Sequence, residues 1–255
     1  MTDWFFDIRT SLILFTRLPV TYYWKSRDNS FSLTKATRAF PVAGVIVGLL
    51  TGLIFCGLAA VGLPLLLAAV LAVAAQAIIT GAMHEDALGD MMDSLGGRDK
   101  DHRLAILEDS RLGTFGVVAV ILALLAKVAL IASLAELTVP WAVLSALIAA
   151  GGLSRAAPVF MAFLMPSVHE DGLGADMGQP DKTGVFQAGG IALLTCLLLI
   201  PIGAALAGLI LAMVAGGIIG SLAQQRFGGH TGDILGTTIG ATEIAFLLGL
   251  CLASA

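Results

Sequence analysis

Long apolar segments alternate with short polar ones along almost the whole chain. Each is close to the ~20 residues that a helix needs to cross the hydrocarbon core of a bilayer. Because that core offers the backbone no water to bond, such segments span it as helices. The sequence therefore predicts an all-α fold, a polytopic membrane helical bundle of about seven transmembrane helices. The predicted spans are 40–62, 64–82, 113–135, 139–165, two short spans within 187–222, and a last one over 235–252.

The composition agrees with this fold class. The chain is 58% hydrophobic and 13% charged, and its mean hydropathy is +0.94, which is typical of a membrane protein. Its 30 glycines suit helices that pack closely within lipid. A net charge of −4 argues against a nucleic-acid partner. The three cysteines all lie in apolar runs, and we interpret them as small buried hydrophobes. Residues 1–255 are interpreted as one integral-membrane domain, with a homo-oligomer left open.

Prolines mark two further boundaries. Residues 1–39 are amphipathic, and we expect an interfacial helix over about 3–17. Pro19 ends that helix, because the residue before a proline avoids the helical region. Pro201 divides 187–222 into two spans hinged at 201–203, and a kinked helix plus a re-entrant piece is the alternative.

Lysine and arginine predict the orientation in the membrane. The segment before the first span carries six of them and residues 83–112 carry four, whereas the turns near 63, 137 and 201 carry none. The positive-inside bias therefore predicts a multi-pass protein of the cell (inner) membrane with its N-terminus in the cytoplasm. The polar segments 83–112 and 223–236 then both face the cytoplasm and can form one active site.

An acidic run, His84 to Asp93, holds five titratable groups in ten residues. In a helix, Asp86, Asp90 and Asp93 share one face at i, i+4 and i+7. Three carboxylates on one face repel one another, and a hard cation among them would offset that repulsion. We therefore predict a Mg²⁺ site whose remaining ligands come from substrate phosphates. A solvated acidic helix face is the alternative. His84 is a candidate general base or a polar helix-end residue, and Leu88 rules out a zinc HExxH motif.

A second polar island runs from Gly228 to Asp233. Its glycines allow backbone N–H groups to approach a phosphate, and Thr231 adds a hydroxyl donor. Asp233 is a further candidate metal ligand, and a flexible turn between spans is the alternative. The predicted metal ligands are thus Glu85, Asp86, Asp90, Asp93 and Asp233, the catalytic residues His84, Asp86, Asp90, Asp93 and Asp233, and the substrate-binding residues Gly228, Gly229, Thr231, Gly232, Ser110 and Arg111.

Several isolated charges have two interpretations. Arg111 precedes a span and is either a phosphate clamp or a residue that snorkels at the membrane surface. Lys127, Arg155 and Glu243 lie within spans, where a charge is a functional hypothesis by default. Structural pairing of these three with one another is the competing hypothesis.

At these motifs the sequence resembles the cobalamin synthase, or adenosylcobinamide-GDP ribazoletransferase, family. The acidic run is similar to the family's H-x-D-G-x-x-D-x-x-D-G, and 109–116 to its D-S-R-x-G-T-F-G. Three further segments are similar: 16–19 to T-R-x-P, 40–44 to F-P-x-x-G, and 228–236 to G-G-x-T-G-D-x-x-G. Departures are Ala87 and Ser94, where glycine is common, and Glu108, where lysine is frequent.

This resemblance implies a reaction. A cobinamide phosphate would pass from adenosylcobinamide-GDP to α-ribazole or its 5′-phosphate, with release of GMP, and the lipid bilayer would surround the enzyme. Mg²⁺ on the diphosphate would be held by the aspartates, with Arg111 and the glycine loop on the leaving GMP. Other intramembrane Mg²⁺/diphosphate transferases, of the prenyltransferase or CDP-alcohol phosphotransferase type, are the alternatives. They normally show a second aspartate cluster or a D-G-x-x-A-R element, and a transporter would show repeat symmetry.

Overall fold

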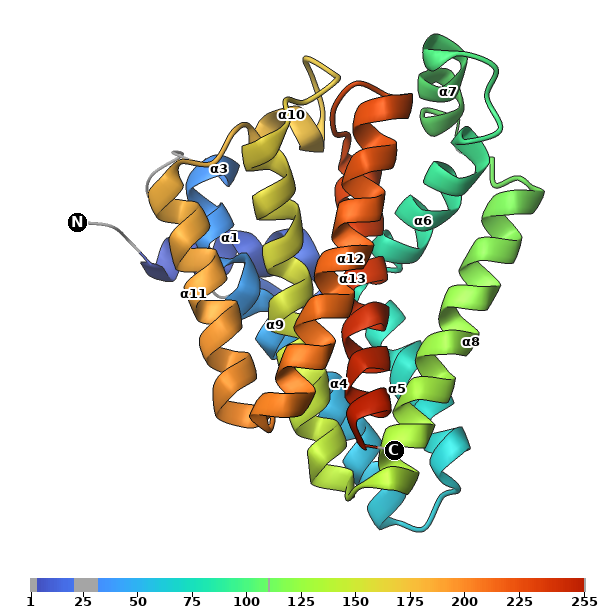
Figure 1. Ribbon diagram of the computed structural model, residues 1–255, viewed down its shortest axis with the longest axis vertical. Coiled ribbons are helices and arrows are strands. Elements are labelled where there is room, and N and C mark those ends of the chain that lie inside the picture. Colours follow the sequence, from blue (N-terminus) through green and yellow to red (C-terminus); the bar gives the residue numbers. More distant parts are fainter. Residues whose placement is uncertain (1–3, 21–31, 110, 255) are drawn as a thin grey trace.

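The computed structural model describes residues 4–20, 32–109 and 111–254, and this part of the chain is a bundle of helices (Figure 1). A single isolated parallel bridge, Ser167 to His230, is the only strand-like pairing within those ranges. The predicted fold class is confirmed. The helices are α1 Trp4–Phe15, α3 Leu33–Ala36, η1 Thr37–Ala39, α4 Phe40–Ala60, α5 Leu65–Thr80, α6 Met83–Ser94, α7 Lys100–Leu107, α8 Thr114–Leu137, α9 Pro140–Leu164, α10 Leu173–Met177, α11 Lys182–Leu199, α12 Ile202–Arg226 and α13 Gly232–Ser254.

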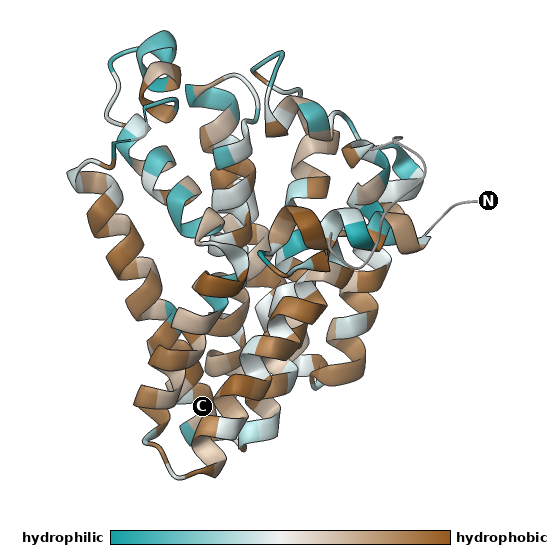
Figure 2. Ribbon diagram, turned by 180° about the vertical axis from the view of Figure 1, so that it is seen from behind, coloured by the Kyte–Doolittle hydropathy of each residue, from teal (hydrophilic) through white to brown (hydrophobic). Residues whose placement is uncertain are grey.

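Six helical segments in the described residues are long and apolar enough to cross a membrane by themselves. Their outer surfaces carry large exposed hydrophobic side chains, such as Leu122 on α8 and Met213 on α12. Figure 2 shows hydrophobic residues over the body of the bundle and hydrophilic ones gathered toward the end that holds α7 and α10. An exposed apolar band of this kind is what a lipid-facing surface requires.

A seventh candidate span is broken into two helices. Helix α5 has only 16 residues and ends at Gly81, whose φ of +68° gives a left-handed C-cap. Ala82 also has a positive φ, +55°, which is uncommon for a residue with a Cβ. The chain then turns by 88° into the polar helix α6. The predicted span 64–82 is therefore shorter than expected, and the acidic run continues it as a tilted helix.

The chain direction gathers the polar connections at one end. Helices α4, α8, α11 and α13 run away from that end, and α9 and α12 run back toward it (Figure 1). The α6–α8, α9–α11 and α12–α13 connections therefore lie together, opposite the short turns near 62, 138 and 200. Both predicted polar islands thus share one end of the bundle.

Glycines allow α4 and α9 to pack closely against each other. A Cβ added at Gly44 of α4 would overlap the carbonyl oxygen of Gly151 of α9, and one at Gly151 would overlap that of Gly44. Helices can approach this closely only where both lack side chains, which is the usual use of small residues in membrane bundles. The pair fixes α4 against α9 through the middle of the molecule.

Two boundary predictions are refined. The segment 187–222 forms two helices separated at Pro201, as expected, but both extend further than predicted. Helix α11 begins at Lys182 because Asp181 caps it, accepting the Gly184 N–H at 2.7 Å. Helix α1 confirms the N-terminal helix. It buries Asp7, which pairs with Arg38, while Phe5 is exposed.

Candidate active site

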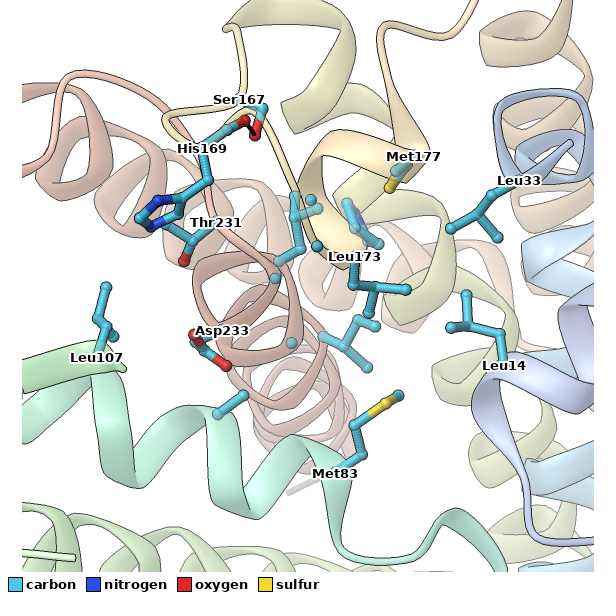
Figure 3. Close-up of a pocket in the computed structure, with 18 of the residues that line it drawn as sticks. Leu14, Leu33, Met83, Leu107, Ser167, His169, Leu173, Met177, Thr231 and Asp233 are labelled. Carbon is cyan, nitrogen blue, oxygen red and sulfur yellow. Dashed lines mark hydrogen bonds between the residues drawn. The ribbon is translucent and has the colours of Figure 1, made fainter. Parts of the chain in front are cut away.

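A pocket of about 590 Å³ opens at the polar end of the bundle. It lies among the acidic helix α6, the start of α13, the loop 167–172 with helix α10, and the end of α1. Figure 3 shows two contrasting sides. His169, Thr231 and Asp233 lie on one side, and the apolar side chains of Leu14, Leu33 and Met177 lie on the other. A ligand with one charged and one apolar part would match this lining.

The charges in the pocket are almost all negative. Asp86 of α6 and Asp233 of α13 line it, together with three acidic residues that were not predicted from the sequence, Glu108, Glu170 and Asp171. Among the described residues that line it, none is a lysine or arginine. An anionic ligand cannot enter such a lining at its usual charge unless cations accompany it, because like charges repel strongly at short range.

Helix α6 is formed as predicted, and it directs its three aspartates to different surroundings. Asp86 lines the pocket. Asp90 is half-buried and lies within electrostatic range of Asp86, Asp233 and Asp93, in that order of strength. Asp86 and Asp233 likewise act on each other across the gap between α6 and α13. The structure therefore brings Asp86, Asp90 and Asp233 together from two segments that are far apart in the sequence.

Asp93 occupies a different position. Its Oδ2 accepts the backbone N–H of Gly113 at 2.6 Å, and its Oδ1 accepts that of Gly116 at 2.9 Å. These are the free N–H groups at the start of α8, so Asp93 acts as a cap for that helix. Both oxygens are thereby engaged, although a carboxylate keeps further lone pairs for other partners.

The glycine island folds into a tight loop. Thr231 caps α13, since its Oγ1 accepts the Ile234 N–H at 3.3 Å. A Cβ on Gly229 would overlap the Pro166 carbonyl oxygen, so glycine is required for this approach. The His230 N–H donates to that oxygen at 3.0 Å. The His230 ring is buried, and burial lowers its pKa. Thr231, Gly232 and Asp233 line the pocket, whereas Gly228 and Gly229 do not.

The 167–172 loop supplies site residues that no sequence motif indicates. Ser167 Oγ donates to the His169 carbonyl at 3.0 Å and shapes the loop. His169 Nδ1 lies 3.9 Å from Glu108 Oε1, and the His169 ring acts electrostatically on Asp233. The local sequence around 167–172 is an ordinary polar loop. Backbone pairing with His230 brings it to the site, because the Val168 N–H donates to the His230 carbonyl at 2.9 Å beside the bond from His230 to Pro166.

His84 and Glu85 face the interior of the bundle. His84 is buried, and its Nε2 lies 3.2 Å from Arg155 Nη2. Arginine can only donate, so this nitrogen is the acceptor and Nδ1 carries the hydrogen. Within the described residues Nδ1 has no partner. The lone pair that a general base would use is therefore already engaged. Glu85 lies within electrostatic range of Arg155.

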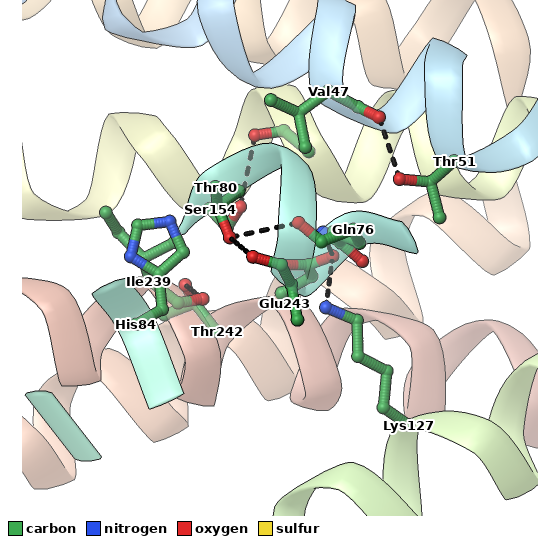
Figure 4. Close-up of polar contacts among 12 residues, drawn as sticks. Val47, Thr51, Gln76, Thr80, His84, Lys127, Ser154, Ile239, Thr242 and Glu243 are labelled. Atoms are coloured by element: carbon green, nitrogen blue, oxygen red, sulfur yellow. Dashed lines mark hydrogen bonds and ion pairs between the residues drawn. The ribbon is translucent and has the colours of Figure 1, made fainter. Parts of the chain in front are cut away.

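The intramembrane charges form one network (Figure 4). Glu243 of α13 accepts from Gln76 at 2.9 Å, pairs with Lys127 at 2.9 Å, and pairs with Arg155 at 3.3 Å. Arg155 also donates to Ser154 at 3.0 Å. Two cations against one carboxylate leave an excess positive charge, which the nearby Glu85 offsets. Of the two hypotheses for these charges, the structure supports pairing with one another.

Arg111 lies outside the pocket. Its side chain is 87% exposed, and its guanidinium pairs with the neighbouring Asp109 at 2.7 Å, a contact that lowers the pKa of that carboxyl. It is not among the pocket-lining residues. Ser110 lies outside the described residues. The predicted phosphate clamp is thus not assembled at this position.

The predicted metal ligands fit an ion that is held partly by the protein and partly by phosphate and water. No three His, Cys, Asp or Glu side chains converge to enclose a metal among the residues that the structure describes. Mg²⁺ is commonly held by one or two carboxylates, with phosphate and water completing its shell. Asp86 and Asp233, with Asp90 close by, supply hard oxygen donors of that kind on a pocket wall.

Comparison with known proteins places the chain in a family. Residues 7–251 match the sequence model of a family described as cobalamin-5-phosphate synthase. A protein of Bradyrhizobium diazoefficiens named adenosylcobinamide-GDP ribazoletransferase is 42% identical, covering 95% of this chain and 92% of the relative. One of Xanthobacter autotrophicus with the same name is 41% identical, covering 96% of each. No solved structure matches the chain.

A helical membrane bundle with an acidic pocket at one end, and with transferases as its relatives, is a membrane-embedded transferase enzyme. The chain belongs to the cobalamin-5-phosphate synthase family, whose members act in cobalamin biosynthesis.

Proposed function

We propose that the enzyme transfers a cobinamide phosphate from adenosylcobinamide-GDP to the ribose hydroxyl of α-ribazole or its 5′-phosphate, in a Mg²⁺-dependent reaction. The lining of the pocket supports the need for a metal ion, because the described residues there include five carboxylates and no lysine or arginine. A diphosphate needs its charge neutralised before phosphoryl transfer. In this pocket a divalent cation is the remaining source of positive charge.

The residues present would each contribute to the transfer. Asp86 and Asp233, with Asp90 close by, would hold Mg²⁺ together with the diphosphate and water, and the ion would supply charge neutralisation on the diphosphate when bound. The ribose oxygen forms a bond to the phosphorus that carries cobinamide, and the bond from that phosphorus to the GMP oxygen breaks. The hydroxyl proton passes to a carboxylate or to His169, the titratable groups on the polar side of the pocket.

The apolar side of the pocket suits the rest of the substrates. Leu14, Leu33, Leu173 and Met177 form a hydrophobic lining opposite Asp233. The benzimidazole of α-ribazole and the corrin periphery carry apolar surface that this lining would remove from water. The tilted helix α6 supports the same interpretation, since it places Asp86 in the pocket wall near that lining.

GMP release from adenosylcobinamide-GDP by the purified protein in detergent tests the proposal. Release should need both an acceptor and Mg²⁺, and should stop with excess EDTA and return when Mg²⁺ is restored. Prenyl diphosphates and CDP-activated alcohols serve as competing donors. Turnover of one of these, with none of adenosylcobinamide-GDP, would replace the proposal with one of the alternative transferases.

We also propose that the pocket faces the cytoplasm, on the basis of the lysine and arginine distribution and the shared end of the polar loops. Single cysteines introduced as Asp101→Cys, Arg226→Cys and Thr138→Cys, in a chain without its three native cysteines, test this. Impermeant reagents should label the first two only from the cytoplasmic side and the third only from the other. Labelling of positions 101 and 226 from opposite sides would contradict a single site.

A further inference from the structure

A second pocket of about 310 Å³ adjoins the main one. Four side chains line both: Leu14, Leu33, Met83 and Leu173. All four are apolar, and Leu14 and Leu33 lie on the side of the main pocket opposite Asp233 (Figure 3). The smaller pocket, which we call the Arg17 pocket, is completed by Ile13, Thr16, Arg17, Thr80 and Asp176. A ligand lying along the apolar side would therefore reach it.

Arg17 is the only lysine or arginine among the described residues that line either pocket. Its side chain is exposed, and it forms no ion pair among the residues described. Its backbone N–H donates to the Ile79 carbonyl at 2.7 Å, which holds it at the end of α5. Its side chain passes over Gly81, where an added Cβ would overlap Nε. The break after α5 thus makes room for this guanidinium.

We propose that the Arg17 pocket binds the phosphomonoester of α-ribazole 5′-phosphate when this is the acceptor, which makes Arg17 a specificity-determining residue. The inference rests on the proposed transfer reaction. A guanidinium fork matches the oxygens of a phosphate, and the acidic main pocket repels any phosphate that lacks a metal ion. The reacting hydroxyl would lie on the polar side, the base against the apolar side chains, and the phosphate at Arg17.

The charge of Asp176 opposes phosphate binding in the Arg17 pocket, and substitution of Asp176 provides a second test of the proposal. Asp176 is the only acidic residue among the described residues that line the Arg17 pocket, and its charge opposes a phosphate there. Removing that charge should therefore improve use of the phosphorylated acceptor, the opposite of removing Arg17. Two variants with opposite expected effects on one substrate separate a binding site from general damage to the fold.

Two competing roles for Arg17 must be separated by experiment. A cation at the C-terminal end of a helix interacts favourably with its carbonyls, so Arg17 could serve only to stabilise α5. A phosphate could also belong to a lipid headgroup at the membrane surface. The first role predicts equal effects on both acceptors, and the second predicts effects that depend on phospholipid rather than on the acceptor.

The test compares kcat/KM for α-ribazole 5′-phosphate and for α-ribazole, in detergent free of phospholipid and in phosphatidylglycerol nanodiscs. Arg17→Ala should lower kcat/KM for the phosphorylated acceptor roughly 10- to 100-fold, mainly through KM, and leave that for α-ribazole unchanged. Arg17→Lys should recover part of the loss, and Asp176→Asn should raise kcat/KM for the phosphorylated acceptor. Arg98→Ala, an exposed arginine outside both pockets, is the control.

Equal losses on both acceptors, or none on either, would overturn the inference, as would an effect seen only in nanodiscs. If the wild type turns over only the phosphorylated acceptor, α-ribazole is assayed as a competitive inhibitor, and its inhibition constant must be unchanged by Arg17→Ala. Failure of the proposed reaction is distinct, because the wild type would then release no GMP with either acceptor.

Discussion

The carboxylate of Asp93 and the backbone N–H of Gly113 form a 2.6 Å hydrogen bond that joins the end of α6 to the start of α8. Asparagine caps a helix about as well as aspartate. Asparagine has only one acceptor oxygen, however, so Asp93→Asn should keep one of the two capping bonds, with turnover within a few-fold of wild type and a melting temperature lowered by a few degrees. Asp93→Ala should lower the free energy of unfolding by about 1 kcal/mol. A loss of Mg²⁺-dependent turnover in the asparagine variant would return Asp93 to the metal site.

Asp86 should behave differently from Asp93, because it lines the pocket. Asp86→Asn removes one charge from a group of repelling carboxylates, so thermal stability should hold or rise. Turnover should fall by ~10² or more, as is typical when an electrostatic group leaves a preorganised site. Asp101→Asn, on the exposed surface of α7, is the matched control. Mg²⁺ titrations of GMP release would show whether the loss is in metal affinity, and an Asp86→Asn enzyme with normal rates would exclude Asp86 as a ligand.

Substitution of Glu243 should mainly lower the stability of the fold. Glu243→Gln leaves Lys127 and Arg155 as buried cations without their carboxylate, and breaking a buried pair costs about 3–5 kcal/mol. A large drop in melting temperature in detergent is expected. Adding Lys127→Met should restore part of it, since one unpaired charge is then removed. Glu136→Gln, exposed at the end of α8, should change the melting temperature little. A double variant no more stable than the single one would show that the pair does not act as a unit.

Two glycines of α4 should respond oppositely to alanine. Gly44→Ala places a methyl group against the Gly151 carbonyl, and overpacking of this kind costs about 1–3 kcal/mol. Gly57 lies in the same helix with nothing within 4 Å of an added Cβ, so Gly57→Ala should be neutral or stabilising. Melting temperatures of the two variants check this. Equal responses would mean that α4 and α9 do not approach each other this closely.

The spans could be predicted because a helix needs a minimum length of apolar residues to cross a bilayer, and such runs can be read directly from the local sequence. The break after α5 could not, since it depends on left-handed backbone at Gly81 and Ala82 in a run that is apolar up to its end. The pairing of Lys127, Arg155 and Glu243 was one of two open hypotheses, because apolar periodicity does not say which faces of distant helices meet.

The sequence predicted only those residues of the candidate site that stand out locally. Asp86, Asp90 and Asp233 are charges in an otherwise apolar chain, and they stand out. His169 and Glu108 lie in polar loops where such residues are ordinary, and they reach the pocket only because backbone bonds join 166–168 to His230. Asp93 resembles its neighbours in sequence, but its capping of α8 depends on how α6 and α8 meet in space.

The contact between Gly44 and Gly151 also bears on how the protein is made. Chains grow at ~5–20 residues per second, so Gly151 leaves the ribosome several seconds after Gly44. Helix α4 must therefore enter the membrane and wait there without its main partner, with its glycine face against lipid or the insertion machinery. The apolar residues that surround those glycines are what keep the waiting helix in place. Assembly of the pocket comes later still, since it also requires Asp233 of α13, which is made after Gly151.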